Sequence, residues 1–216
     1  MASLKTENRQ LTTENRELKT FAVIAQGAEA VIRTDRITVV KERIPKSYRH
    51  SEIDERLRKS RTRREARIIG KINSILPSPK LISADEYSIS MDFIDGQKLR
   101  DVLEKSDYKK LCRTIGAQLA VMHNNDIVHG DLTTSNMILK DNKIFFIDFG
   151  LSFQSSKIED RAVDLWLMKQ AFESKHYTIS SKCFEGVIEG YKGANDFSKI
   201  LNRLKEVELR GRNKKK

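Results

Sequence analysis

Two short polar motifs, placed one after the other in the second half of the chain, constrain its fold more than any other feature. The first runs from His129 to Asn136 and reads His-Gly-Asp-Leu-Thr-Thr-Ser-Asn. The second is Asp148-Phe149-Gly150, which begins twelve residues after Asn136. Either motif alone would be weak evidence, but chance seldom gives both in this order. We therefore expect Asp131, Asn136 and Asp148 to meet on two neighbouring loops.

These three side chains are the ones that phosphoryl transfer requires. The reaction needs an acceptor for the proton of the attacking hydroxyl, and it needs Mg²⁺ held against the phosphates. An aspartate and an asparagine five residues apart on one loop can serve both needs, and a second aspartate after a strand completes the metal site. The sequence thus predicts Asp131 as the catalytic acid–base group, Asn136 and Asp148 as metal ligands, and ATP and Mg²⁺ as cofactors.

The upstream half of the chain must then supply a cation for the phosphates. Lys41 follows the apolar pair Val39-Val40, where a strand can deliver its side chain into a cleft. Glu65, on the next expected helix, is its predicted partner, although an acid among arginines would ordinarily form only a surface salt bridge. The segment Gln26-Gly27-Ala28-Glu29 lies between the first two expected strands, where backbone N–H groups could cover the phosphates. One glycine is a weak signal for such a loop.

The order of secondary-structure signals predicts an α+β chain with two lobes. Short β-rich segments are expected at 21–24, 30–33, 37–40, 80–84 and 88–93, with a basic helix over 52–75 between the third and fourth. A strand pair at Met137–Leu139 and Ile144–Ile147 should turn at Asp141-Asn142. Helices are expected over about 160–174, 180–191 and 196–207, and an apolar helical face carries Leu111, Ile115, Leu119 and Met122. We assign 1–20 as a polar flexible extension, 21–95 and 96–207 as the two lobes, and 208–216 as a basic tail.

The formal net charge of +11 is concentrated in two segments. Residues 56–67 contain seven basic residues and one acid, and residues 203–216 contain seven basic residues and two acids. Charge concentrated in this way can neutralise the phosphates of a nucleic acid. The alternative is a solvated helix face followed by a frayed tail.

Other features bear on the compartment. No apolar run approaches the ~20 residues that span a bilayer, and Met1–Thr20 lacks the apolar core of a secretory signal. Cys112 and Cys183 lie in expected helices and are predicted to be buried thiols rather than a disulfide or a metal site. We expect a cytoplasmic protein without a membrane partner, with the nucleus as a further compartment in a eukaryote.

Several strings together resemble one small family. They are Gln26-Gly27-Ala28-Glu29-Ala30, Lys46-Ser47-Tyr48-Arg49-His50, the two motifs above with Leu151-Ser152-Phe153, and Leu209-Arg210-Gly211-Arg212. Over about residues 21–213 the chain resembles the PRPK-type kinase subunit of the KEOPS/EKC complex. That resemblance implies a minimal, RIO-like serine/threonine protein kinase or ATPase. It also implies work beside a subunit that forms tRNA threonylcarbamoyladenosine, and a small regulatory subunit as a further partner.

The resemblance also implies roles for single residues. Asp131 would be the catalytic base or would orient water, Lys41 would bind the α- and β-phosphates, and Glu65 would orient Lys41. Met91 would be the gatekeeper, while Asp92 and Ile94 would offer backbone groups to adenine. Asp164 would anchor the catalytic loop from a helix, unless it is an ordinary surface charge. tRNA would bind through the basic helix and the tail with Arg210 and Arg212, and the tail could instead fold into the cleft or dock on a partner.

Two departures from ordinary protein kinases stand out. Thr133 occupies the position of a lysine that helps to hold the γ-phosphate, and losing such a donor can cost about 3–4 kcal/mol. Only sixteen residues separate Asp148 from Asp164, and no Ala-Pro-Glu sequence occurs. The chain therefore has a truncated activation segment with no peptide-docking platform. We expect weak activity on loose protein substrates.

Two other function classes remain open at this point. Small-molecule kinases of the aminoglycoside or choline type share the His-x-Asp…Asn pattern, but they usually need a larger helical insert than this chain can spare. A non-catalytic scaffold that binds ATP and tRNA would account for the basic segments. It would leave the complete set of metal ligands without a purpose.

Overall fold

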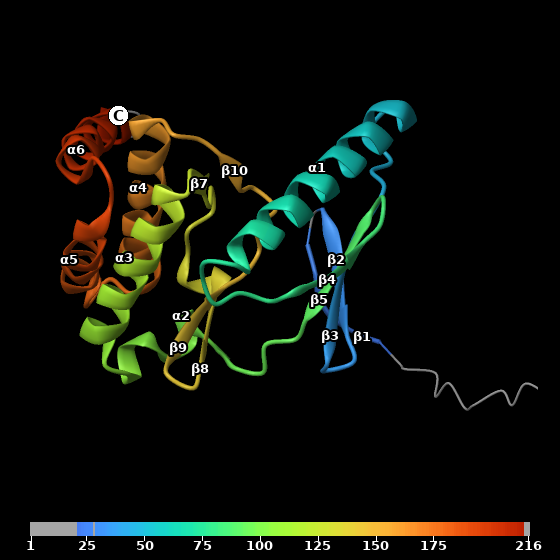
Figure 1. The fold of residues 1–216 in the computed structure, drawn as a ribbon, viewed down its shortest axis with the longest axis horizontal. Helices are drawn as coiled ribbons and strands as arrows, with labels where there is room; N and C mark the ends of the chain where they lie inside the picture. Colours follow the sequence, from blue (N-terminus) through green and yellow to red (C-terminus); the bar gives the residue numbers. More distant parts are fainter. Residues whose placement is uncertain (1–20, 28, 214–216) are drawn as a thin grey trace, which may run out of the picture.

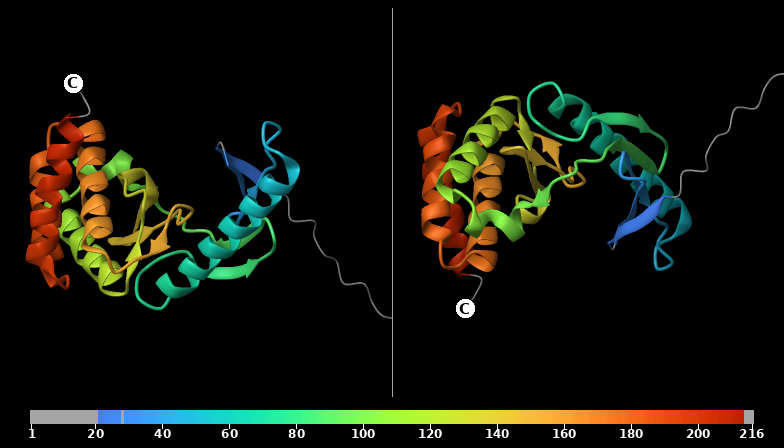
Figure 2. Two further views of the ribbon diagram at one scale, coloured as in Figure 1. Left: turned by 90° about the horizontal axis from the view of Figure 1, so that it is seen from above. Right: turned by 90° about the horizontal axis from the view of Figure 1, so that it is seen from below.

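The computed structural model describes residues 21–27 and 29–213, with the last three as backbone only. A strand-rich amino-terminal lobe and a helical carboxy-terminal lobe stand side by side (Figure 1). Viewed from above and below, the helices of the second lobe lie on the side away from the sheet (Figure 2). The expected α+β arrangement is confirmed. The extension 1–20, Ala28 and the end of the tail at 214–216 lie outside the described residues.

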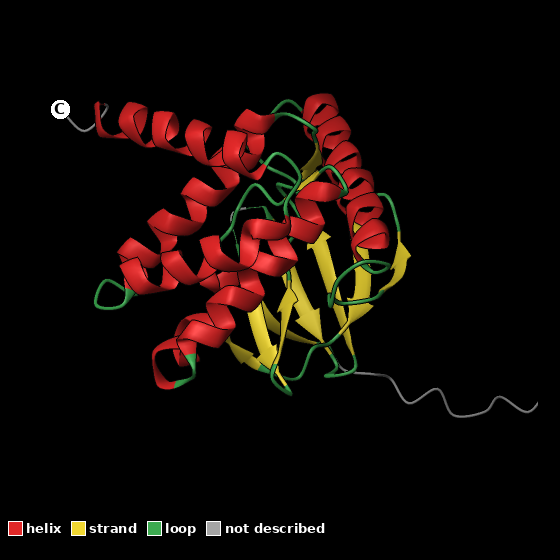
Figure 3. Cartoon of the chain, turned by 60° about the vertical axis from the view of Figure 1, so that its left-hand side comes forward, coloured by secondary structure: helices red, strands yellow, loops and turns green. Residues whose placement is uncertain are grey.

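The amino-terminal lobe is a five-stranded antiparallel sheet in the order β1-β2-β3-β5-β4. Its strands are β1 (Ala22–Gln26), β2 (Ala30–Thr34), β3 (Thr38–Arg43), β4 (Leu81–Ala84) and β5 (Ser88–Asp92). Helix α1 (Ser51–Ile72) packs against β4 and β5 (Figure 3). Ile68, Ile69 and Ile72 of this helix are buried with Ile89 of β5. Burial of this apolar stripe holds α1, and the residues it carries, against the sheet.

A short connection after β5 leads to the second lobe through a glycine that the geometry requires. A Cβ on Gly96 would lie 2.6 Å from Ile138 Cγ2 and 2.7 Å from the carbonyl oxygen of Leu139. The next two residues form β6 (Gln97–Lys98), which pairs with β8 (Met137–Lys140). Gly96 is therefore a point of close contact between the connection and β8.

The second lobe contains the strand pair predicted between the two motifs. β8 is hydrogen-bonded to β9 (Lys143–Phe146), and Lys140 lies opposite Lys143. The two residues between them, Asp141 and Asn142, have φ values of 50° and 58°. Both lie in the left-handed region that a two-residue hairpin turn of this kind requires, and Asp and Asn tolerate it. The predicted turn is confirmed.

Helices make up most of the rest of this lobe: α2 (Leu99–Val102), α3 (Tyr108–Asn124), α4 (Ile158–Lys175), α5 (Ser180–Gly190) and α6 (Phe197–Asn213). The four apolar residues expected on one face of α3 are all buried. Cys112 and Cys183 are buried free thiols, as predicted. Short 3₁₀ turns, η1 (Leu103–Lys105), η2 (Thr134–Asn136) and η3 (Tyr191–Gly193), complete the lobe.

A second small strand pair was not expected. β7 (Ile127–Val128) ends next to His129, and β10 (Phe153–Gln154) begins after Ser152. They pair antiparallel, with Phe153 opposite Val128. The start of the first motif and the end of the segment after the second are therefore tied together.

The last helix is longer than the sequence indicated. α6 continues to Asn213, so residues 208–213 are helical rather than part of an irregular tail. Arg210 Nη2 lies 2.9 Å from Glu159 Oε1, and Lys169 Nζ lies 2.8 Å from Glu208 Oε1. These contacts hold this stretch against α4, so Arg210 does not fold back into the cleft. The side chain of Arg212 lies outside the described residues.

Within the described part of the chain, no helix combines the length and the apolar character needed to cross a bilayer.

Candidate functional site

A cavity of about 300 Å³ lies between the two lobes. The wall on the amino-terminal lobe comes from β1, β2 and β3, with Ile24, Ala25, Ile32, Val39 and Lys41. Glu65 and Ile69 of α1 and Pro79 also line the cavity. The end of β5 and the connection between the lobes contribute Met91, Asp92, Phe93, Ile94 and Gly96. The wall on the carboxy-terminal lobe comprises Lys98, Asn136, Ile138, Ile147, Asp148 and Phe149. Apolar walls with charged groups at one end are suited to a ligand that has an apolar ring and an anionic chain.

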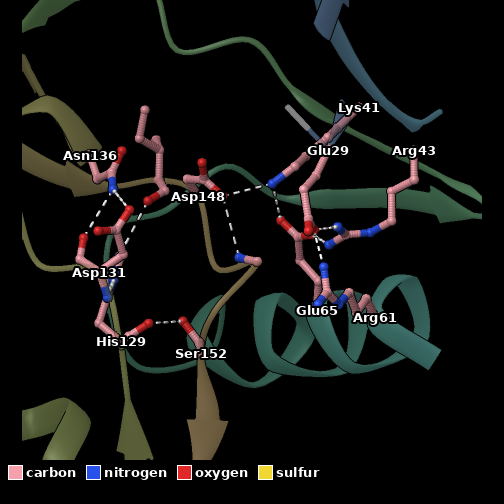
Figure 4. Close-up of polar contacts among 12 residues, drawn as sticks. Glu29, Lys41, Arg43, Arg61, Glu65, His129, Asp131, Asn136, Asp148 and Ser152 are labelled. Carbon is pink, nitrogen blue, oxygen red and sulfur yellow. Dashed lines mark hydrogen bonds and ion pairs between the residues drawn. The ribbon is translucent and has the colours of Figure 1, made fainter. Parts of the chain in front are cut away.

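Lys41 occupies the centre of the charged end (Figure 4). Its Nζ lies 2.7 Å from Glu65 Oε1 and 2.7 Å from Asp148 Oδ1, so the expected pair with Glu65 forms. Arg43, two residues further along β3, binds the other oxygen of Glu65 through Nη2. Burial would lower the pKa of Lys41, but the carboxylates of Glu65 and Asp148 raise it above its usual value. The sequence did not reveal that Glu65 serves two buried cations.

Asp148 stands at a constrained point of the backbone. Its φ is 62°, in the left-handed region, and its Oδ1 accepts a hydrogen bond from the N–H of Gly150 at 3.3 Å. A Cβ on Gly150 would lie 3.2 Å from Asp148 Oδ1 and 3.3 Å from Lys41 Nζ, so glycine keeps this corner open. Burial would raise the pKa of Asp148, but Lys41 and the N–H of Gly150 hold it below its usual value. The side chain is therefore an anion.

Asp131 and Asn136 face each other across the loop that forms the first motif (Figure 4). Asn136 Nδ2 donates to the carbonyl oxygen of Asp131 at 2.9 Å and to its Oδ2 at 2.8 Å. Because the amide nitrogen is used twice, the amide oxygen is the atom left to bind a cation. Asn136 and Asp148 line the same cavity.

These two oxygen donors fit Mg²⁺, which is usually held by one or two protein oxygens together with water and substrate phosphates. Among the residues that the structure describes, no cluster of three or more His, Cys, Asp or Glu side chains could form a metal site made of protein alone. The donor set therefore fits a metal that arrives with a phosphorylated ligand.

Asp164 of α4 fixes the start of the same loop. It is fully buried, its Oδ2 accepts from the N–H of His129 at 2.8 Å, and its Oδ1 accepts from the N–H of Gly130 at 2.8 Å. Gly130 has a φ of 79°, and a Cβ there would lie 2.6 Å from the carbonyl oxygen of Leu151. Asp164 is therefore the predicted anchor and not a surface charge, and only glycine fits at position 130.

His129 links the two motifs. Its Nδ1 accepts from the N–H of Asp131 at 3.3 Å, so its Nε2 carries the proton and donates to the carbonyl oxygen of Ile147 at 3.3 Å. Burial lowers the pKa of His129, and the imidazole is neutral. Ser152 Oγ donates to the carbonyl oxygen of His129 at 2.7 Å. These bonds fix the relative position of Asp131 and Asp148.

The loop between β1 and β2 is closed by a hydrogen bond from the N–H of Gly27 to the carbonyl oxygen of Ala30 at 2.9 Å. Gln26 ends β1, Ala28 lies outside the described residues, and Glu29 turns toward Arg61, Arg43 and Arg49. The hydrogen bond from Arg61 lowers the pKa of Glu29. None of the described loop residues lines the cavity, whereas Met91, Asp92 and Ile94 do.

Some cavity residues escaped the sequence analysis. Ile24, Ile32 and Val39 could have been found from the alternation of inward and outward residues along their strands. Lys98 lies in a two-residue strand whose partner is some forty residues away, and no local pattern marks it.

The two lobes, the cation held by a helix glutamate and the anchored loop with Asp131 and Asn136 define a minimal protein-kinase fold. A family model described as RIO domain matches residues 31–183. The chain belongs to the RIO domain family and, within it, to the relatives of the KEOPS subunit Bud32.

Among its relatives is the KEOPS complex subunit Bud32 of Pyrococcus abyssi, 42% identical over 209 residues, with 88% of this chain and 95% of that protein covered. The EKC/KEOPS complex subunit BUD32 of Encephalitozoon cuniculi is 42% identical over 189 residues, with 87% and 93% covered. A probable bifunctional tRNA threonylcarbamoyladenosine biosynthesis protein of Methanobrevibacter smithii is 41% identical over 200 residues. The match covers 88% of this chain but only 36% of that protein.

The fold also matches a solved structure. A Rio2 kinase complex with ADP/Mg²⁺ and phosphoaspartate, from Chaetomium thermophilum, superposes with a TM-score of 0.60 at 16% sequence identity, covering 91% of this chain and 71% of that one. The predicted kinase fold and the predicted family are thereby confirmed.

Proposed function

We propose that this protein is a Mg-ATP-dependent phosphotransferase that acts as an ATPase or a serine/threonine protein kinase. One observation carries the proposal. Lys41 Nζ lies 2.7 Å from both Glu65 and Asp148 at the edge of a cavity that also contains Asn136. A cation from one lobe, two metal-binding oxygens from the other and an adjacent carboxylate, Asp131, are the parts that phosphoryl transfer uses.

Each residue then has a defined task. Lys41 binds the α- and β-phosphates, and Glu65 and Arg43 keep its side chain in place. Asn136 and Asp148 hold Mg²⁺, which neutralises the charge of the triphosphate. Asp131 accepts the proton of the attacking hydroxyl or orients a water molecule.

The remaining predicted cofactor residues hold the ends of the nucleotide. Met91, Asp92 and Ile94 bind adenine at the connection between the lobes, where they line the cavity. The segment Gln26-Gly27-Ala28-Glu29 covers the phosphates from above. We propose that it does so only after a rearrangement of the loop, since its described residues stand back from the cavity.

The intrinsic rate should be low. Thr133 leaves the catalytic loop without the lysine of ordinary kinases, and α4 begins at Ile158, ten residues after Asp148. So short a segment leaves no platform for a peptide substrate.

We further propose that the protein works within a KEOPS/EKC assembly in the cytoplasm. Its partners there are a threonylcarbamoyl-transferase subunit, a small regulatory subunit and tRNA. The names of the Bud32 relatives and of the bifunctional tRNA-modification proteins support this proposal. In the bifunctional protein of Methanobrevibacter smithii the matched segment occupies 36% of the chain, so most of that polypeptide lies outside the match.

The test of the enzymatic proposal is Asp131→Asn. An asparagine can still accept the hydrogen bond from Asn136 Nδ2, so the loop should keep its shape while the proton acceptor is removed. We expect ATP hydrolysis and self-phosphorylation to fall by about 10²–10⁴-fold. Binding of Mg-ATP, measured by calorimetry, should change by no more than a few-fold.

A matched control is Asp85→Asn, which makes the same chemical change at an exposed position in the turn between β4 and β5. Its turnover should equal that of the wild type. Unchanged turnover in Asp131→Asn would refute the catalytic role and favour a scaffold that only binds nucleotide.

A further inference from the structure

The cavity wall on the carboxy-terminal lobe contains a lysine to which no role has been assigned above. Thr133 leaves the catalytic loop without a cation, and the ammonium of Lys41 is already shared by Glu65 and Asp148. Lys98 lines the same cavity from the carboxy-terminal lobe, together with Asn136 and Asp148. The inference that follows rests on the proposed nucleotide site.

The backbone of Lys98 is held firmly. It follows Gly96 at the close contact with β8, and it lies opposite Ile138 in the pairing of β6 with β8. Residues directly opposite one another in an antiparallel pair project from the same face. Because Ile138 lines the cavity, the side chain of Lys98 is directed to the cavity as well.

The ammonium group lies beside the catalytic loop. Lys98 Nζ donates to the carbonyl oxygen of Ser135 at 3.0 Å, and Ser135 immediately precedes Asn136. Within the described residues, the hydrogen-bond partner of the Lys98 ammonium is this uncharged carbonyl oxygen. An ammonium has three donors, so two remain for a ligand.

The electrostatic surroundings call for an anion. Burial lowers the pKa of Lys98 and Arg100 lowers it further, while Asp148 and Asp101 partly oppose these effects. The side chain is solvent-exposed at the mouth of the cavity and forms no ion pair among the described residues, so its ammonium is free to bind an anionic ligand through charge-assisted hydrogen bonds. The cavity that Lys98 lines is the place where such an anion would enter.

We propose that Lys98 is a second phosphate-binding cation of the nucleotide site. It lines the same cavity as the residues of the connection and as Asn136 and Asp148, and its ammonium is bonded to the carbonyl oxygen of the residue before Asn136. A nucleotide that extends from Ile94 to Asp148 passes Lys98, whose free donors reach its phosphate oxygens. Lys98 thereby replaces, from β6, the positive charge that Thr133 does not provide.

The test is Lys98→Met, with binding of adenosine, ADP·Mg²⁺ and ATP·Mg²⁺ measured by calorimetry on the full chain. Methionine keeps the apolar stem and removes the charge. Because the variant cannot form a charge-assisted hydrogen bond with a phosphate, the affinity for ATP should fall by about ten- to a hundredfold. ADP should also bind more weakly, whereas the affinity for adenosine should not change.

Two further variants sharpen the result. Lys98→Arg keeps the charge and should retain most of the ATP affinity. Lys182→Met removes an exposed lysine of α5, outside the cavity, and should bind all three ligands as the wild type does. Thermal unfolding of each variant verifies the fold.

The possible results separate the two proposals. An equal loss of affinity for adenosine and ATP, or wild-type ATP affinity in Lys98→Met, overturns the role of Lys98 in phosphate binding while leaving the nucleotide site intact. A wild-type protein that binds adenosine but neither ADP·Mg²⁺ nor ATP·Mg²⁺ contradicts the proposed function itself, and the role of Lys98 falls with it.

Discussion

At the scale of single residues, Glu65 is a buried carboxylate that pairs with two buried cations. It is 1% exposed and binds Lys41 and Arg43, whose side chains are 10% and 5% exposed. The two kinase motifs predicted its pairing with Lys41, because a kinase-type site needs that partner. Nothing in the sequence identified Arg43, because its approach to Glu65 depends on how α1 lies against β3.

Glu65→Gln should therefore destabilise the protein strongly. The amide can still accept hydrogen bonds, but Lys41 then keeps only Asp148 and Arg43 only Glu29 as an ionic partner. Breaking a buried ion pair in this way costs about 3–5 kcal/mol. The free energy of unfolding in urea measures the effect. Glu86→Gln is the control, because Glu86 is 57% exposed and its pair with Lys59 should contribute about 1 kcal/mol or less. Equal stability of the two variants would contradict the buried-pair argument.

At the scale of elements, long periodic segments were predictable and very short ones were not. The apolar face of α3 follows from its 3.6-residue period, and the turn at Asp141-Asn142 follows from residues that tolerate a positive φ. By contrast, β6, β7 and β10 have two residues each and form only because partners distant in the sequence are brought alongside. Lys98 was missed for that reason.

The packing of α3 on α5 gives a prediction at this scale. A Cβ on Gly116 of α3 would lie 2.0 Å from the carbonyl oxygen of Val187, so the two backbones touch. Gly116→Ala should lower stability by about 1–3 kcal/mol, since the helices must move apart. Gly70→Ala should instead raise it by about 0.5–1 kcal/mol, because Gly70 is exposed in α1 and a Cβ there meets nothing within 4 Å. Melting temperatures that shift in the same direction for both variants would refute this account.

At the scale of the whole molecule, the fold makes the surface of α1 more basic than its composition alone suggests. The acids Asp54 and Glu65 are 3% and 1% exposed, so their charges are turned inward. The charges of two arginines are also neutralised locally, because Arg58 pairs with Asp54 and Arg61 pairs with Glu29. The exposed arginines that remain, Arg56, Arg63, Arg64 and Arg67, line one shallow hollow, together with the exposed acids Glu52 and Glu55 of the first turns of the helix. The charge count could be read from the sequence, but the burial of Asp54 and Glu65 could not.

This exposed basic face is the part of the molecule best suited to the phosphates of tRNA, the nucleic acid that the proposed function requires. Replacing Arg63, Arg64 and Arg67 together by alanine should weaken tRNA binding and reduce its dependence on salt. The slope of log affinity against log salt should become shallower by about 0.7–0.9 for each phosphate that the protein no longer neutralises. Filter binding at several salt concentrations measures it.

The control removes the same number of charges elsewhere. Lys175, Lys182 and Lys192 are exposed at the end of α4, in α5 and in η3, and their replacement by alanine lowers the net charge equally. If long-range attraction by the net charge governs binding, both triple variants should lose affinity alike. If tRNA contacts the face of α1 directly, only the arginine variant should show the shallower slope, because counterions are released where phosphates are neutralised. Identical slopes for both variants would remove α1 as the tRNA-binding surface and leave the kinase site unaffected.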